Sequence, residues 1–125
     1  MAKILVVDDD PAVREILTLN LKGKGHEVTA VSDGAQGVEA ARRERPDVVF
    51  LDCEMPTLAG EGAFEKFRAH PAMAEIPVIF LSSLPLSRQV GRVPVSRDVR
   101  FLRKPVNGGE LFAVLAEVLA GRGSH

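Results

Sequence analysis

Short apolar runs alternate with amphipathic segments along this chain, a pattern that predicts strands alternating with helices. Three runs are almost continuously apolar, as is typical of strands buried on both faces of a sheet. Two others interleave apolar and polar residues, as is typical of edge strands. In chain order the predicted strands cover residues 3–8, 27–31, 47–52, 77–82 and 99–104, and the second and fifth are the edges.

Helices are predicted between the strands from apolar spacing, capping residues and prolines. Helices that connect successive strands favour an α/β fold with a parallel sheet covered on both sides. The markers are Pro11 followed by Val13, Ile16, Leu17 and Leu21 on one face; Asp33 with Gln36 as a capping box, followed by Val38 and Ala41; Phe64 and Phe67; and Asn107 with Glu110 as a capping box, followed by Leu111, Val114, Leu115, Val118 and Leu119.

The segment between the last two strands is an unusual helix candidate. Pro85 can begin a helix, but Gly91 weakens it and Pro94 ends it, so we expect a fourth helix that is short or irregular. Residues 83–103 also hold five arginines against one aspartate, a net charge of +4. An exposed, solvated face is the ordinary explanation of such a charge, and a surface for a partner is the alternative.

The composition fits one globular domain. A chain of 125 residues with 46% hydrophobic and 26% charged residues can bury a core, which argues against disorder. We expect this domain to span residues 1–121, with 122–125 as a tail that looks added for expression and leaves open a longer natural chain.

Charge and cysteine content bear on location and partners. The net charge of -1 gives no general attraction to nucleic acid or to anionic membranes, and we expect neither as a direct partner. The single Cys53 cannot form an internal disulfide, and no apolar run is long enough for a membrane span. We therefore expect a cytoplasmic protein.

Polar residues end four of the five predicted strands, and these are the candidate site residues. The carboxyl ends of parallel strands meet at one edge of a sheet, where open α/β sheets bind ligands. The residues are Asp8 and Asp9 at the end of the first strand, Asp52 at the end of the third, Ser82 at the end of the fourth and Lys104 at the end of the fifth.

Three consecutive carboxylates at Asp8, Asp9 and Asp10 repel one another and need compensation. A cation, a helix N-terminus or exposure to water could each provide it. Asp10 precedes Pro11 and suits the N-cap of the first helix. His26, His70 and His125 lie far apart without metal-ligand spacing, and we expect them to be surface residues.

Four motifs, in this order, resemble those of the receiver domain of two-component response regulators, the family that includes the small chemotaxis regulator. They are VVDDD, VVFLDCEMPTLAG, PVIFLS and FLRKP, and the resemblance covers about residues 2–120. It implies a five-stranded parallel sheet in the order 2-1-3-4-5 flanked by five helices. It also implies a signalling domain rather than an enzyme.

The resemblance further implies a role for each site residue. Asp52 would accept a phosphoryl group from a histidine kinase or a phosphotransfer protein. Ser82 and Lys104 would contact phosphoryl oxygens, and Lys104 would pair with Asp52 beforehand. Mg²⁺ would be bound directly by Asp9, Asp52 and the backbone carbonyl of Glu54, and by Asp8 through a water molecule.

Ser82 and Phe101 would form a switch between this site and a partner-binding face. That face comprises the fourth helix, the fifth strand and the fifth helix, and its downstream target is unknown. Phe101 has no hydroxyl group, so we expect its ring to favour a buried position even without phosphorylation. The resemblance also implies a cis peptide bond between Lys104 and Pro105.

Two other function classes remain open. Asp-dependent phosphatases of the haloacid-dehalogenase type also place Asp-x-Asp after a strand, as at Asp8 and Asp10. They need a second acidic pair downstream and a cap, for which this chain leaves little room. The other alternative is a receiver-like interaction module that does not switch, which the irregular fourth helix weakly favours.

Overall fold

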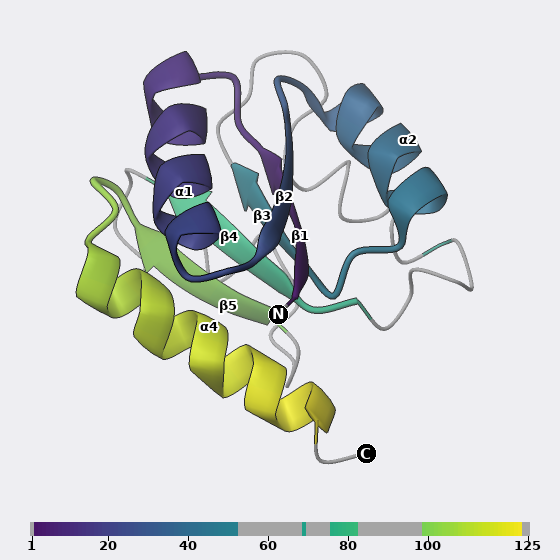
Figure 1. The fold of residues 1–125 in the computed structure, drawn as a ribbon. Coiled ribbons are helices and arrows are strands. Elements are labelled where there is room, and N and C mark those ends of the chain that lie inside the picture. Colours follow the sequence, from purple (N-terminus) through teal and green to yellow (C-terminus); the bar gives the residue numbers. More distant parts are fainter. Residues whose placement is uncertain (1, 53–68, 70–75, 83–98, 124–125) are drawn as a thin grey trace.

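A five-stranded parallel sheet forms the centre of the molecule (Figure 1). The computed structural model describes residues 2–52, 69, 76–82 and 99–123. The strand order is β2-β1-β3-β4-β5, and each neighbouring pair is parallel, which confirms the predicted fold class and strand order. The strands are β1 (Lys3–Val7), β2 (Glu27–Val31), β3 (Val48–Asp52), β4 (Val78–Ser82) and β5 (Val99–Arg103).

Three described helices cover the two faces of this sheet. They are α1 (Pro11–Gly23), α2 (Gly34–Glu44) and α4 (Gly108–Gly123), of which α4 is the helix predicted last in the chain. α1 and α4 pack on one face and α2 packs on the other (Figure 1). The helices expected around residues 64–67 and 85–93 lie outside the described residues. No helix in the described ranges has both the length and the apolar content of a membrane span.

The strands divide their side chains between two apolar cores. β3 and β4 are buried along their whole length, as predicted for central strands. Leu5, Val49 and Phe80 face the core beneath α2, whereas Ile4, Phe50 and Ile79 face the core beneath α1 and α4. Because side chains alternate along a strand, consecutive residues at each strand end also point to opposite faces.

Capping residues set where the helices begin, as predicted. The Asp10 carboxylate accepts a hydrogen bond from the Ala12 amide at 2.9 Å, with Pro11 in the first turn. Asn107 Oδ1 accepts from the amides of Gly109 and Glu110 at 2.8 and 3.2 Å.

The start of α2 differs from the predicted capping box in one respect. Asp33 accepts from the Gln36 amide at 2.7 Å, as expected. The Gln36 side chain, however, accepts from the amide and hydroxyl of Ser32, each at 3.4 Å. The second hydrogen bond of the box therefore involves the residue before the N-cap.

α2 approaches β1 very closely at Gly37. A Cβ atom at this position would lie 2.8 Å from Cγ2 of Val7, which is closer than side-chain packing permits. Val7 is the last residue of β1, directly before Asp8. The absence of a side chain at Gly37 thus lets α2 pack against the end of the strand that leads into the acidic residues.

Two expectations about single side chains are wrong. Ile16 was expected on the buried face of α1, but it is 49% exposed, and Leu19 is 65% exposed. α1 buries only the stripe that contains Leu17 and Leu21, and Ile16 lies about 100° around the helix from Leu17. His26 is half-buried rather than a simple surface residue, and its Nδ1 accepts a hydrogen bond from the Ala2 amide at 3.0 Å. His70 and His125 lie outside the described residues.

His26 predicts a pH dependence of stability. Burial lowers the pKa of His26 below its ordinary value of 6.5, so the unfolded chain binds this proton at a higher pH than the folded chain does. Protonation also removes the acceptor for the Ala2 amide. The free energy of unfolding should therefore lose the His26 contribution as the pH falls below 6.5.

The measurement is urea unfolding between about pH 7.5 and about pH 5.5, without metal, on the wild type and on His26→Asn. Asn keeps an acceptor near the position of Nδ1 but does not titrate. The wild type should lose more stability than His26→Asn across this interval, and equal losses would contradict the prediction.

Candidate functional site

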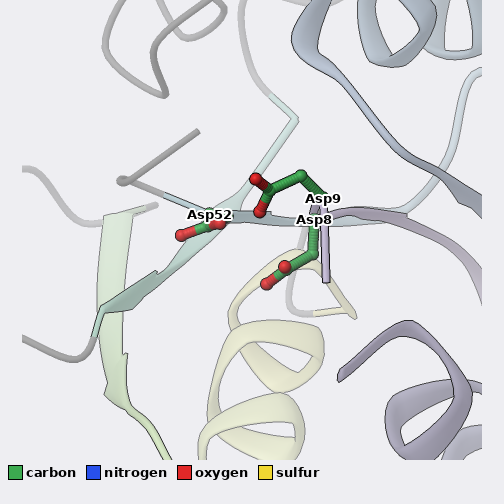
Figure 2. A group of neighbouring side chains, drawn as sticks. All are labelled: Asp8, Asp9 and Asp52. Atoms are coloured by element: carbon green, nitrogen blue, oxygen red, sulfur yellow. The ribbon is translucent and has the colours of Figure 1, made fainter. Parts of the chain in front are cut away.

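Three carboxylates meet at the carboxyl edge of the sheet. Asp8 and Asp9 follow β1, and Asp52 is the last residue of the neighbouring strand β3. One carboxylate oxygen of each residue lies within 4.8 Å of those of the other two. Figure 2 shows Asp8 and Asp9 leaving the chain in opposite directions. Asp8 and Asp52 are 0% and 1% exposed, whereas Asp9 is exposed to solvent.

Lys104 joins the two buried carboxylates. Its Nζ lies 3.0 Å from Asp8 Oδ2 and 3.3 Å from Asp52 Oδ1. Lys104 follows β5, so its side chain reaches across the ends of β4 and β3 toward β1. Its backbone amide donates a hydrogen bond to the Ser82 carbonyl at 2.8 Å. This bond holds the backbone of Lys104 beside the end of β4. The peptide bond between Lys104 and Pro105 is cis.

The charge state of Lys104 follows from two opposing effects. Burial alone lowers the pKa of Lys104, but close contact with Asp8 and the negative charges of Asp52 and Asp8 outweigh it. The pKa therefore lies above its ordinary value of 10.5. A lysine whose pKa is raised by folding stabilises the fold fully below 10.5 and loses that contribution as the pH rises above it. At neutral pH the site thus contains a permanent ammonium group.

The two oxygens of Asp8 differ in their partners. Oδ1 accepts a hydrogen bond from the Asp10 amide at 2.9 Å. Oδ2 is buried and contacts the Lys104 ammonium group at 3.0 Å, and no other donor among the described residues reaches it. A buried carboxylate oxygen that can accept a further contact, and that lies beside two other carboxylates, suits a second positively charged partner. Oxygen ligands of this kind suit a hard divalent cation.

Sequence reasoning missed one residue of this region. Arg14 Nη1 donates a hydrogen bond to the backbone carbonyl of Asp8 at 2.9 Å. The only signal in the sequence is a basic residue one helical turn after the N-cap Asp10, and such residues are common on exposed helix faces.

The two residues expected to form a switch lie on neighbouring strands. Ser82 ends β4 and is buried. Phe101, on β5, is half-buried, and its ring stacks on that of Phe80 with a centroid distance of 5.5 Å and an interplanar angle of 24°. Glu54, whose backbone carbonyl was expected to bind metal, lies outside the described residues, as does most of the basic segment 83–103.

Comparison with known proteins relates this chain to a family. The model of the response regulator receiver domain matches residues 4–116. PilH of Pseudomonas aeruginosa is 37% identical over 123 residues, which are 97% of this chain and 100% of PilH. The DNA-binding response regulator MtrA of Mycolicibacterium smegmatis is 38% identical over 81 residues, which are 65% of this chain and 34% of MtrA. The chain thus matches the whole of PilH but only about a third of MtrA.

Solved structures give the same relationship. The receiver domain of the sensor histidine kinase PA1611 from Pseudomonas aeruginosa is 30% identical, with a TM-score of 0.86, and the match covers 95% of this chain and 98% of that one. That structure is described with a magnesium ion coordinated in its active-site cleft. CheY4 of Vibrio cholerae is 29% identical, with a TM-score of 0.84 and coverage of 94% and 98%.

Because Asp8 and Asp52 share the ammonium group of Lys104, we expect Lys104→Met to have a large effect on stability. The substitution leaves two buried carboxylates without their cation, which should lower the free energy of unfolding at neutral pH by about 3 kcal/mol. Millimolar Mg²⁺ should recover part of the loss, because a ligand of the folded state stabilises it by mass action. Urea unfolding with and without Mg²⁺ measures both effects.

Lys22→Met provides the control, because Lys22 is an exposed lysine in the last turn of α1. It should change stability by less than about 0.5 kcal/mol. Equal stabilities of Lys104→Met and Lys22→Met would show that the two buried carboxylates do not depend on Lys104.

Proposed function

The chain belongs to the response regulator receiver family, and we propose that residues 1–121 accept a phosphoryl group on Asp52 from a histidine kinase or a phosphotransfer protein. The contact of Lys104 with both Asp8 and Asp52 is the observation that carries this proposal. It keeps a permanent positive charge beside a buried carboxylate at a strand end, where a transferred anionic group needs it. The proposal includes a cytoplasmic location, with which the single Cys53 is compatible.

The transfer itself is an in-line displacement at phosphorus. A carboxylate oxygen of Asp52 forms the new O–P bond while the P–N bond to the donor imidazole breaks. The imidazole keeps the electron pair of that bond and takes up a proton. The negative carboxylate must approach a negative phosphoryl group, and the ammonium group of Lys104 reduces their repulsion.

Mg²⁺ is the proposed cofactor, because it would supply the remaining positive charge. The three carboxylates and the spare capacity of Asp8 Oδ2 fit this cation. Asp8 is already held by the Asp10 amide and by Lys104, which favours an indirect role through water. Asp9 is exposed and suits direct coordination, together with Asp52 and the backbone carbonyl of Glu54. The magnesium ion described in the PA1611 receiver domain supports this assignment.

Ser82 and Phe101 are the proposed switch. The Ser82 hydroxyl would donate to a phosphoryl oxygen, a charge-assisted hydrogen bond that draws it toward the site. The Phe101 ring already stacks on Phe80 before any such change. We therefore expect the partner-binding face to be biased toward its active arrangement in the unphosphorylated protein.

The two alternative functions have less support. A phosphatase of the haloacid-dehalogenase type needs a second acidic pair, but the described ends of β4 and β5 present Ser82 and Lys104. A module that does not switch would not need the buried pairing of Lys104 with Asp8 and Asp52.

The proposal predicts a single phosphorylation that depends on Asp52 and on Mg²⁺. Intact mass spectrometry after incubation with acetyl phosphate should show one added phosphoryl group, and no addition when Mg²⁺ is omitted. Asp52→Asn should abolish the addition.

Asp10→Asn is the matched control for this experiment. It removes a neighbouring carboxylate but preserves the helix N-cap, because Asn caps helices as well as Asp does. It should be phosphorylated like the wild type. Phosphorylation of Asp52→Asn at another residue would overturn the assignment of the acceptor.

Because the Phe101 ring already stacks on Phe80, we expect only a small change in the partner-binding face on activation. Amide spectra of residues 85–101 should shift less on addition of beryllofluoride, a phosphoryl mimic, in the wild type than in Phe101→Tyr. The Tyr hydroxyl favours contact with water and so competes with the buried ring position. Shifts in the wild type as large as those in Phe101→Tyr would show that the inward ring does not bias this face.

A further inference from the structure

Arg14 contacts the acidic site through its main chain and not through its carboxylates. Its Nη1 lies 2.9 Å from the Asp8 carbonyl oxygen, and its side chain is half-buried. Arg14 belongs to the second turn of α1, where its amide donates to the Asp10 carbonyl at 3.1 Å. The side chain therefore ties the first residues of the helix back across the turn to the end of β1. This hydrogen bond uses a backbone oxygen and none of the carboxylate oxygens of the site.

The Asp8 and Asp9 side chains are positioned by different means. The Asp8 carboxylate is buried and is held by the Asp10 amide and by Lys104. The Asp9 carboxylate is exposed, and no hydrogen bond or ion pair joins it to the rest of the described chain. The direction of Asp9 is thus set by the backbone that carries it. The carbonyl that Arg14 binds belongs to the peptide unit joining Asp8 to Asp9.

We propose that Arg14 is a positioning residue for the metal site: its hydrogen bond to the Asp8 carbonyl fixes the Asp8–Asp9 peptide and thereby directs the Asp9 carboxylate toward Mg²⁺. This inference rests on the proposed function, because it requires that Mg²⁺ binds here. It assigns to Arg14 the role that outer hydrogen-bond partners have at other metal sites, where they orient a ligand without touching the ion.

The charge of Arg14 makes the proposal easy to distinguish from a simple electrostatic effect. A guanidinium group close to the site repels a divalent cation, so its removal alone would tighten Mg²⁺ binding. Loss of ligand positioning has the opposite sign and would weaken binding. The direction of the change in affinity therefore separates the two effects.

The test is calorimetric titration of Mg²⁺ into five proteins: the wild type, Arg14→Met, Arg14→Lys, Asp9→Asn and the double variant Arg14→Met with Asp9→Asn. Met approximates the aliphatic part of the Arg side chain but has neither donor nor charge, whereas Lys keeps both a donor and the charge. Arg14→Met should weaken binding about tenfold, the lower end for loss of an outer partner of a metal ligand. Arg14→Lys should recover part of the affinity. In the Asp9→Asn background, Arg14→Met should cause no further loss of Mg²⁺ affinity, because the side chain that Arg14 positions has lost its charge.

Lys22→Met is the control for loss of a positive charge on the same helix, and it should bind Mg²⁺ as the wild type does. Thermal melting without metal establishes that each variant is folded. If Arg14→Met does not fold, Arg14→Gln, which keeps a donor on a shorter neutral side chain, takes its place with the same expected weakening.

Three results would overturn different parts of the argument. A wild type that does not bind Mg²⁺ overturns the proposed metal site itself. A wild type that binds, together with an Arg14→Met variant that binds equally well or more tightly, overturns only the role of Arg14. An equal loss in the wild-type and Asp9→Asn backgrounds would show that Arg14 does not act through Asp9, and it would also overturn the inference.

Discussion

Two buried carboxylates, Asp8 and Asp52, share the single ammonium group of Lys104 at the edge of the sheet, and the rest of the site depends on this sharing. Either carboxylate alone would be costly to bury, because the interior solvates a charge poorly. One cation between two anions leaves a net negative charge, and the exposed Asp9 adds to it. The three carboxylates together with this one ammonium group carry a net negative charge, which a divalent cation would offset.

The sheet makes this sharing geometrically possible. Asp8 and Asp52 meet because β1 and β3 are neighbours and end at the same level. Lys104 starts two strands farther along the sheet, and its amide is held by Ser82 at the end of β4. The strands that carry these residues are packed on both faces by apolar cores, and α2 presses directly on Val7 through Gly37. A rigid platform of this kind helps to keep the charged groups at fixed separations.

Periodicity in the sequence was sufficient to locate the strands and to predict a parallel sheet, because buried central strands leave continuous apolar runs such as those of β3 and β4. The strand order came from the family resemblance, since periodicity does not say which strands are neighbours. The candidate site residues could be predicted because the carboxyl ends of parallel strands meet at one edge of the sheet. The same topology brings these residues together in the structure.

Details that depend on tertiary contacts could not be predicted in this way. The exposure of Ile16 follows from how narrow a stripe of α1 the sheet covers, and helical spacing alone does not carry that information. The contact of Arg14 with a backbone carbonyl joins two elements and has no signature in residue type. The hydrogen bond of His26 to Ala2 is of the same kind.

The chain gives each of the three consecutive aspartates a different environment. Asp8 is buried beside Lys104, Asp9 is exposed on the opposite side of the chain, and Asp10 caps α1. Alternation at the end of a strand makes the first two leave the chain in opposite directions, and the start of a helix accommodates the third with its free amides. The turn between β1 and α1 is therefore a part of the site in its own right. Its geometry decides how much of the acidic charge faces the cation, and its hydrogen bonds, including that from Arg14, are where the affinity for the cation can be adjusted without changing a ligand.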